Sequence, residues 1–155
     1  MKQIIYTGQE IANIIGAKLI SDNPSDIKAV DILIDSRRLI GAKHTLFFAL
    51  VTKKNDGHRY IRELYEKGIR YFVVNKPPKS FEGYKKCSFF IVNDTLEALQ
   101  MLSAFHRSRF DIPVIGITGS NGKTVIKEWL FQLINPDKNI VRSPKSYNSQ
   151  IGVPL

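Results

Sequence analysis

Apolar positions alternate between helical and strand spacing along the first part of the chain. Thr7-Gly8-Gln9-Glu10 has the pattern of a capping box, in which residues one and four of the segment bond each other's backbone. Ile11, Ile14 and Ile15 follow at helical spacing, so a short helix is predicted to end near Gly16.

Five short apolar runs of strand length come next, separated by polar and turn residues. They lie at Lys18–Ile20, Ile32–Ile34, Leu46–Leu50, Tyr71–Val74 and Ser88–Val92. A helix is predicted between the third and fourth runs, beginning near His58, because Ile61, Leu64 and Tyr65 share one face and Gly68 follows as a stop. Residues 1–93 are therefore predicted to form a small α/β domain.

A new pattern begins with a second capping box, Asp94-Thr95-Leu96-Glu97, and we place the domain boundary there. The helix that it opens is predicted to run to about Arg109, with an apolar stripe at Ala98, Met101, Leu102 and Phe105. The segment Val114–Thr118 is almost entirely apolar, which predicts a strand of a parallel sheet. A helix is predicted over Lys123–Leu133 and a further strand over Ile140–Arg142, so residues 94–155 are predicted to begin a parallel-sheet domain.

Composition and charge narrow the class of protein. No apolar run approaches the roughly 20 residues that span a bilayer, and no signal peptide opens the chain, so a cytoplasmic protein is expected. The single cysteine, Cys87, cannot form an internal disulfide and is predicted to be packed.

The formal net charge of +9 is concentrated in the first domain, where 16 Lys and Arg face 9 acidic residues, against 7 and 5 in residues 94–155. This predicts an anionic ligand, or else a solvated lysine-rich face. Nothing in the chain resembles a known nucleic-acid motif, so no nucleic acid is expected, and a monomer is our expectation.

The strongest chemical signal is the glycine loop between the predicted strand and helix. In Gly119-Ser120-Asn121-Gly122-Lys123-Thr124, the glycines let backbone N–H groups approach a phosphate at the helix amino terminus. Lys123 is predicted to reach the β- and γ-phosphates of a nucleoside triphosphate, and the Thr124 hydroxyl to bind Mg²⁺. Ile117 stands where the strict GxxxxGK[ST] pattern has its first glycine, so the loop is a TGxxGKT variant.

The segment from Gly116 to Thr124 resembles the ATP loop of the Mur ligases, ATP-dependent enzymes that form amide bonds in peptidoglycan synthesis. Asp35-Ser36-Arg37, Leu46–Leu50 and Asp56-Gly57-His58 follow the order of that family's UDP-binding domain. Two segments, Lys127-Glu128 and residues 146–154, are similar to those of the members that add D-alanyl-D-alanine. Residues 125–129 are similar to the corresponding segment of members fused ahead of an alanine racemase. Ser149 departs from the family, where a second asparagine is common.

This resemblance implies a small UDP-binding domain followed by the start of a P-loop ATPase domain. It implies an ATP- and Mg²⁺-dependent reaction that joins D-alanyl-D-alanine to UDP-N-acetylmuramoyl-tripeptide by way of an acyl phosphate. Lys123 would be the catalytic residue, whereas Ser36, Arg37, Asp56, His58 and Asn148 would bind the substrate. The chain is about a third of such an enzyme, so we expect a fragment that is inactive by itself.

Two other classes stay open on the residues alone. A different P-loop kinase or NTPase would use the same loop, although such a loop usually lies near the start of its domain. A non-enzymatic module would use only the basic first domain to bind an anion. Without the resemblance, Arg37 and Arg38 could be a solvated pair at a strand end, and Asp56-Gly57-His58 could be a turn and helix cap.

Overall fold

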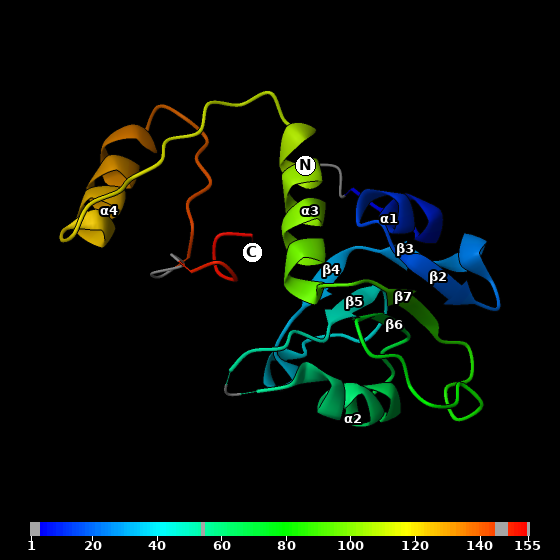
Figure 1. Ribbon diagram of the computed structural model, residues 1–155. Helices are drawn as coiled ribbons and strands as arrows, with labels where there is room; N and C mark the ends of the chain where they lie inside the picture. Colours follow the sequence, from blue (N-terminus) through cyan, green and yellow to red (C-terminus); the bar gives the residue numbers. More distant parts are fainter. Residues whose placement is uncertain (1–3, 54, 145–148, 155) are drawn as a thin grey trace. The chain divides into compact units, whose positions relative to one another are not determined.

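The computed structural model describes residues 4–53, 55–144 and 149–154 (Figure 1). The chain forms two compact units, and the boundary between them in the sequence lies between Phe105 and His106. All strands assigned in the described residues belong to the first unit. The second unit contains the helix α4 (Lys123–Ile134).

A five-stranded sheet in the order β2-β7-β6-β5-β4 forms the centre of the first unit. Its strands are β2 (Lys18–Ser21), β4 (Asp31–Leu33), β5 (Thr45–Phe48), β6 (Tyr71–Val74) and β7 (Ser88–Ile91). β4 to β7 are parallel, and β2 is antiparallel to β7. The five predicted strands are confirmed, each to within two residues at either end. A separate antiparallel pair joins β1 (Tyr6–Thr7) to β3 (Lys28–Ala29).

Three helices accompany the sheet, and two of them begin at the caps that the sequence predicts. α1 (Gly8–Ile14) starts at the complete capping box of Thr7 and Glu10. Before α3 (Thr95–Ser108), the Asp94 carboxylate accepts from the backbone N–H groups of Leu96 and Glu97 over 2.7 and 3.2 Å. The third helix, α2 (Ile61–Glu66), and the 3₁₀ turns η1 (Pro24–Asp26), η2 (Ser36–Arg38) and η3 (Gly57–Tyr60) complete the unit.

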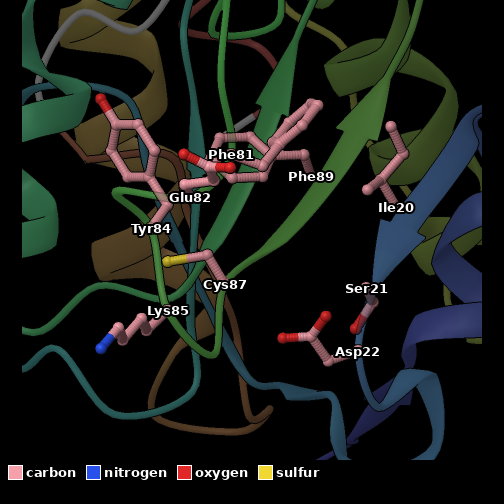
Figure 2. A pocket seen from close by; sticks show the side chains of 9 residues that line it. All are labelled: Ile20, Ser21, Asp22, Phe81, Glu82, Tyr84, Lys85, Cys87 and Phe89. Atoms are coloured by element: carbon pink, nitrogen blue, oxygen red, sulfur yellow. The ribbon is translucent and has the colours of Figure 1, made fainter.

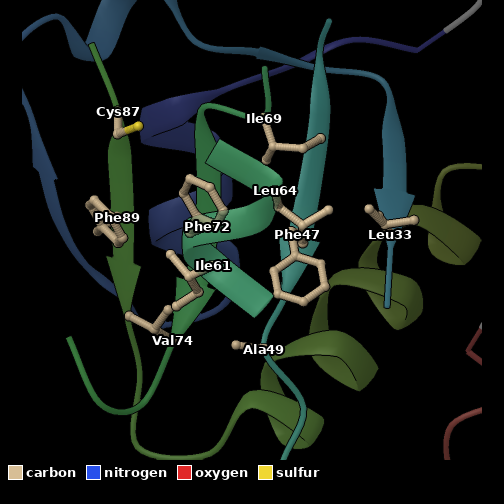
Figure 3. Packing of buried hydrophobic residues seen from close by; sticks show 10 residues of the cluster. All are labelled: Leu33, Phe47, Ala49, Ile61, Leu64, Ile69, Phe72, Val74, Cys87 and Phe89. Carbon is tan, nitrogen blue, oxygen red and sulfur yellow. The ribbon is translucent and has the colours of Figure 1, made fainter. Parts of the chain in front are cut away.

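One face of the sheet packs against α2 (Figure 3). Ile61 and Leu64 of α2 are buried there against aromatic residues of the strands. The rings of Phe72 and Phe89, on adjacent strands, stack with their centroids 5.3 Å apart. The buried residues of this cluster are Leu33, Phe47, Ala49, Ile61, Leu64, Ile69, Phe72, Val74, Cys87 and Phe89.

The other face of the sheet is covered by α1 and α3 (Figure 1). Phe48, Val73 and Phe90 alternate with the residues of the α2 face and are completely buried. α3 contributes buried Ala98, Leu99 and Leu102. Because both faces are covered, the parallel strands consist of nearly continuous apolar residues rather than an alternating pattern.

The second unit differs from the sequence prediction. α4 is confirmed, but the strands predicted at Val114–Thr118 and Ile140–Arg142 do not form, and these predictions are wrong for this structure. A strand exists only where a partner meets its backbone N–H and C=O groups, and no strand pairing occurs among the described residues after Phe105. Val114 and Ile115 are consequently 65% and 67% exposed, and no residue of α4 is buried.

Helix α3 packs with the first unit. The Thr95 hydroxyl donates to the carbonyl oxygen of Ala49 over 3.2 Å, and the rings of Tyr6 and Phe105 meet edge to face. The boundary between the two compact units therefore lies about a dozen residues after residues 93 and 94, where the sequence places the boundary between functional domains. That functional boundary stays a prediction.

Candidate functional site

The loops that follow the parallel strands meet at one edge of the sheet, which we call the carboxyl edge. Open α/β sheets bind ligands outside the carboxyl ends of their strands. η2 follows β4, η3 lies beyond the loop after β5, Asn75 and Lys76 follow β6 directly, and α3 begins after β7. The topology therefore brings Ser36, Arg37, Asp56 and His58 to the same edge.

Ser36 and Arg37 lie in η2, which Asp35 caps. Ser36 is buried, whereas the Arg37 side chain is 86% exposed. Nε and Nη2 of Arg37 donate to the two carboxylate oxygens of Asp35 over 2.9 and 2.7 Å. These bonds lower the pKa of Asp35 to about 2. The fork of Arg37 is thus held in place at the edge, with most of its surface open to an anion.

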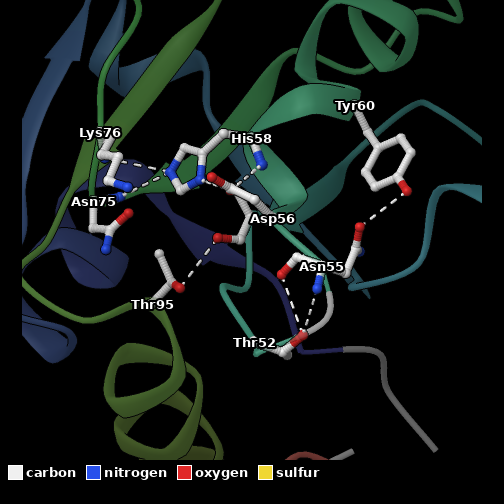
Figure 4. A network of polar contacts seen from close by, with 9 residues as sticks. Thr52, Asn55, Asp56, His58, Tyr60, Asn75, Lys76 and Thr95 are labelled. Carbon is white, nitrogen blue, oxygen red and sulfur yellow. Dashed lines mark hydrogen bonds and ion pairs between the residues drawn. The ribbon is translucent and has the colours of Figure 1, made fainter.

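Asp56 and His58 form a network with the end of β6 (Figure 4). The Asp56 carboxylate Oδ1 accepts from the backbone N–H of His58 over 3.0 Å and lies 2.6 Å from its Nδ1. Nε2 of His58 accepts from the backbone N–H groups of Asn75 and Lys76, both over 3.3 Å. Backbone and ring hydrogen bonds from His58 lower the pKa of Asp56.

Sequence reasoning missed Asn75 and Lys76. Oδ1 of Asn75 is buried without a hydrogen-bond partner in the structure, and Lys76 is exposed at the same edge. A signal for them existed, because polar residues directly after a buried parallel strand are placed at the ligand-binding edge. Asn148, also predicted to bind substrate, lies outside the described residues.

The predicted phosphate-binding segment, residues 119–124, lies at the start of α4 in the second unit, and we call it the phosphate loop. Gly119 and Gly122 have φ of +145° and +75°, conformations that side chains disfavour. Gly122 is the N-cap of α4 and makes no side-chain cap bond, and the first turn of the helix holds no acidic residue. The positive end of α4 is thus open to an anion. Ser120 and Asn121 lie exposed between the two glycines.

Lys123 and Thr124 form the start of α4, as the phosphate-loop reading requires. The Lys123 ammonium donates to the backbone carbonyl of Gly119, so it lies across the loop where a phosphate would be bound. One turn later, Lys127 donates to the Ser143 carbonyl over 2.9 Å, and Glu128 pairs with Arg142. These contacts hold residues 142 and 143 beside α4.

A pocket of about 340 Å³ opens at the other end of β7 (Figure 2). Its wall includes Phe81, Cys87 and Phe89, and Ser21 and Asp22 face them from the end of β2. Ser21 pairs with Ser88, the first residue of β7, so the pocket lies at the amino edge and away from the residues described above. Burial raises the pKa of the Cys87 thiol to about 11, as the sequence prediction of a packed cysteine requires.

Within the described residues, no group of three or more His, Cys, Asp and Glu side chains could hold a metal ion. The described helices include none with the length and apolar character needed to cross a membrane.

The chain is similar to Mur ligases in sequence and in structure, although no protein-family model matches it. It is 36% identical over 129 residues, 83% of its length, to the UDP-N-acetylmuramoyl-tripeptide–D-alanyl-D-alanine ligase of Synechocystis. The Bacillus subtilis ligase of the same name is 28% identical over 96% of the chain. A crystal structure of MurF from Acinetobacter baumannii superposes over 99% of the chain with a TM-score of 0.86 and 25% identity. MurF from Thermotoga maritima, solved with ADP, gives 0.68 over 81%.

This chain belongs to the Mur ligase family, and its α/β fold is that of the family's amino-terminal part. The relatives named above are of the MurF type, UDP-N-acetylmuramoyl-tripeptide–D-alanyl-D-alanine ligases. The chain spans about a third of their length: 28% of the Synechocystis protein, 32% of the Bacillus protein and 33% of the Acinetobacter chain.

Proposed function

We propose that this chain is the nucleotide-binding part of an ATP-dependent ligase that joins D-alanyl-D-alanine to UDP-N-acetylmuramoyl-tripeptide. Its first unit binds the UDP end of the tripeptide substrate, and its phosphate loop binds ATP with Mg²⁺. The protein is a monomer in the cytoplasm, where both ATP and the UDP-linked substrate occur.

The observation that carries this proposal is the geometry of the phosphate loop. Two glycines with positive φ lead into a helix that has no side-chain cap, and a lysine occupies its first turn. Such a terminus binds phosphate through backbone N–H groups and the helix dipole. The Thermotoga relative was solved in complex with ADP, which supports nucleotide binding in the family.

The reaction proceeds in two steps. The tripeptide carboxylate takes the γ-phosphoryl group of ATP, which gives an acyl phosphate and ADP. The amine of D-alanyl-D-alanine then attacks the acyl carbon, and phosphate leaves as the amide forms. The residues of this chain orient and neutralise charge: Lys123 holds the γ-phosphate, and the backbone from Gly119 to Gly122 surrounds the β-phosphate.

The Thr124 hydroxyl would hold Mg²⁺, which would neutralise part of the charge of the phosphates. At the carboxyl edge, Arg37 suits a diphosphate because its guanidinium is exposed and has N–H donors beyond the two that Asp35 accepts from. Ser36 lies beside it, so we assign both residues to the UDP moiety.

Calorimetric titration of the chain tests the two sites separately. UDP-N-acetylmuramoyl-tripeptide should bind, and Arg37→Ala should weaken it by about tenfold or more, because a charge-assisted pair is lost. Arg62→Ala is the matched control, since Arg62 pairs with Glu66 on α2 and donates to the Gly83 carbonyl, beside the wall of the pocket at the start of β7. ATP with Mg²⁺ should bind the wild-type chain and Lys138→Ala but not Lys123→Ala.

Each other outcome selects a different function. Binding of ATP that depends on Lys123, without binding of the UDP compound, would favour another P-loop NTPase or kinase. Salt-sensitive binding to a short DNA duplex, without binding of either nucleotide, would favour the basic anion-binding module.

A further inference from the structure

Asp56, Gly57 and His58 each have a structural function within the first unit, and we call them the clasp. Asp56 caps η3 and bonds the ring of His58. Gly57 donates its N–H to the Leu50 carbonyl over 2.9 Å. His58 reaches the end of β6 (Figure 4). The clasp therefore joins the loop after β5 to the residues after β6.

Gly57 allows this connection because its backbone approaches β5 closely. A Cβ atom at this position would lie 2.8 Å from the carbonyl carbon of Ala49 and from the nitrogen of Leu50. Backbone atoms cannot move aside as a flexible side chain can. Any side chain at position 57 would thus push η3, and His58 with it, away from the sheet.

The hydrogen bonds of His58 determine its tautomer. Nε2 accepts from two backbone N–H groups, so it carries no proton. The ring proton is therefore on Nδ1, where it is donated to the Asp56 carboxylate over 2.6 Å. Both ring nitrogens are used within the fold, and the side chain is only 12% exposed.

The clasp fixes the backbone of two residues that have side chains at the carboxyl edge. Lys76 is exposed there, directly after Asn75, and its charge contributes to the lowered pKa of Asp56. The amide oxygen of Asn75 is buried without a partner.

We propose that His58 is a positioning residue of the UDP site rather than a ligand of the substrate. As an Nδ1–H tautomer it holds the backbone of Asn75 and Lys76, so that the Lys76 ammonium meets the diphosphate of the nucleotide. This inference rests on the proposed UDP site, and it revises the direct substrate contact predicted for Asp56 and His58.

Nitrogen-15 NMR of the imidazole in the free chain tests the clasp without any ligand. The shifts should show a neutral ring with the proton on Nδ1. Asp56→Asn should keep this signature, because the amide oxygen still accepts from Nδ1–H. A proton on Nε2 in the wild-type chain would overturn the proposal.

Titration with UDP-N-acetylmuramoyl-tripeptide tests what the clasp positions. Asp56→Asn should bind within about twofold of wild type, whereas Asp56→Ala and His58→Ala should lose about tenfold or more. Lys76→Ala should lose a similar factor and leave the His58 signature unchanged, because only the side chain is removed. Arg62→Ala is the control.

The outcomes separate this inference from the proposed function. If the wild-type chain does not bind the UDP compound, the UDP site fails while the tautomer measurement still decides the role of His58 in the fold. Wild-type affinity in folded His58→Ala, or in Lys76→Ala, would overturn the positioning role. Loss of affinity in Asp56→Asn with the Nδ1–H signature retained would indicate direct contact by the carboxylate instead.

Discussion

At the residue scale, the pair of Asp35 and Arg37 has a measurable electrostatic signature. The guanidinium lowers the pKa of Asp35 to about 2 from an ordinary value of 3.8. Because the folded pKa is depressed, the pair stabilises the fold above the ordinary carboxyl pKa, and this contribution is lost as the pH falls through about 2. NMR titration of the Asp35 carboxyl should show the low midpoint, and Arg37→Ala should return it toward the ordinary range. An unchanged midpoint in that variant would contradict the pairing.

Cys87 provides a chemical probe of the first unit. Its side chain lies in the buried cluster, and burial raises the pKa of the thiol to about 11. Since the thiolate is the reactive form, the native chain should react with a disulfide reagent far more slowly than the unfolded chain. The rate in the native chain, followed by absorbance at mildly alkaline pH, should rise steeply with denaturant. A native rate equal to that of a free thiol would show that the α2 face is not closed.

At the element scale, the capping box of α1 should contribute separately to stability. The Thr7 hydroxyl accepts from the Glu10 backbone N–H over 3.3 Å, and Glu10 accepts from the Thr7 backbone N–H over 2.8 Å. Thr7→Ala should lower the free energy of unfolding of the first unit by about 1 kcal/mol, whereas Thr7→Ser should retain most of it. Protection of Cys87 against labelling is the suitable measurement, because Trp129 reports on the second unit. Equal losses in both variants would assign the effect to packing of the threonine methyl group.

Local pattern was sufficient for some elements and insufficient for others. The apolar side of α2 at Ile61 and Leu64 and the caps at Thr7 and Asp94 follow from residues close together in sequence, and these predictions are confirmed. Val114–Thr118 has the composition of a buried strand, yet composition cannot supply a partner, and the strand does not form here. The bond from His58 to Asn75 spans 17 residues and depends on the parallel pairing of β5 with β6. No local pattern predicts such a contact.

At the scale of the whole molecule, the two units differ in how much apolar surface they bury. The first has covered both faces of its sheet, and Phe47, Phe72 and Phe90 are at most 1% exposed. In the second, Val125, Trp129 and Leu133 recur along one side of α4 and are 51%, 62% and 73% exposed. In this unit the predicted helix after the loop is confirmed, whereas the two predicted strands do not form, and phosphate binding by the loop stays a prediction. A phosphate loop needs only a helix start and two glycines, whereas a sheet needs partner strands.

This difference predicts that the two units of the chain have different stabilities. Burial of apolar surface is the main favourable term in folding, and an isolated helix shorter than about 12–15 residues is marginal in water. Amides of β5, β6 and β7 should therefore exchange with solvent several orders of magnitude more slowly than those of α4. Hydrogen exchange followed by mass spectrometry measures both units in one sample. Trp129 should also emit at nearly the same wavelength before and after denaturation, because it is already exposed. Protection of α4 equal to that of β6, or a large red shift of Trp129 on unfolding, would contradict this prediction, because either result would show that the apolar side of α4 is buried in solution. Self-association measured by sedimentation would then show that a second copy of the chain covers this side.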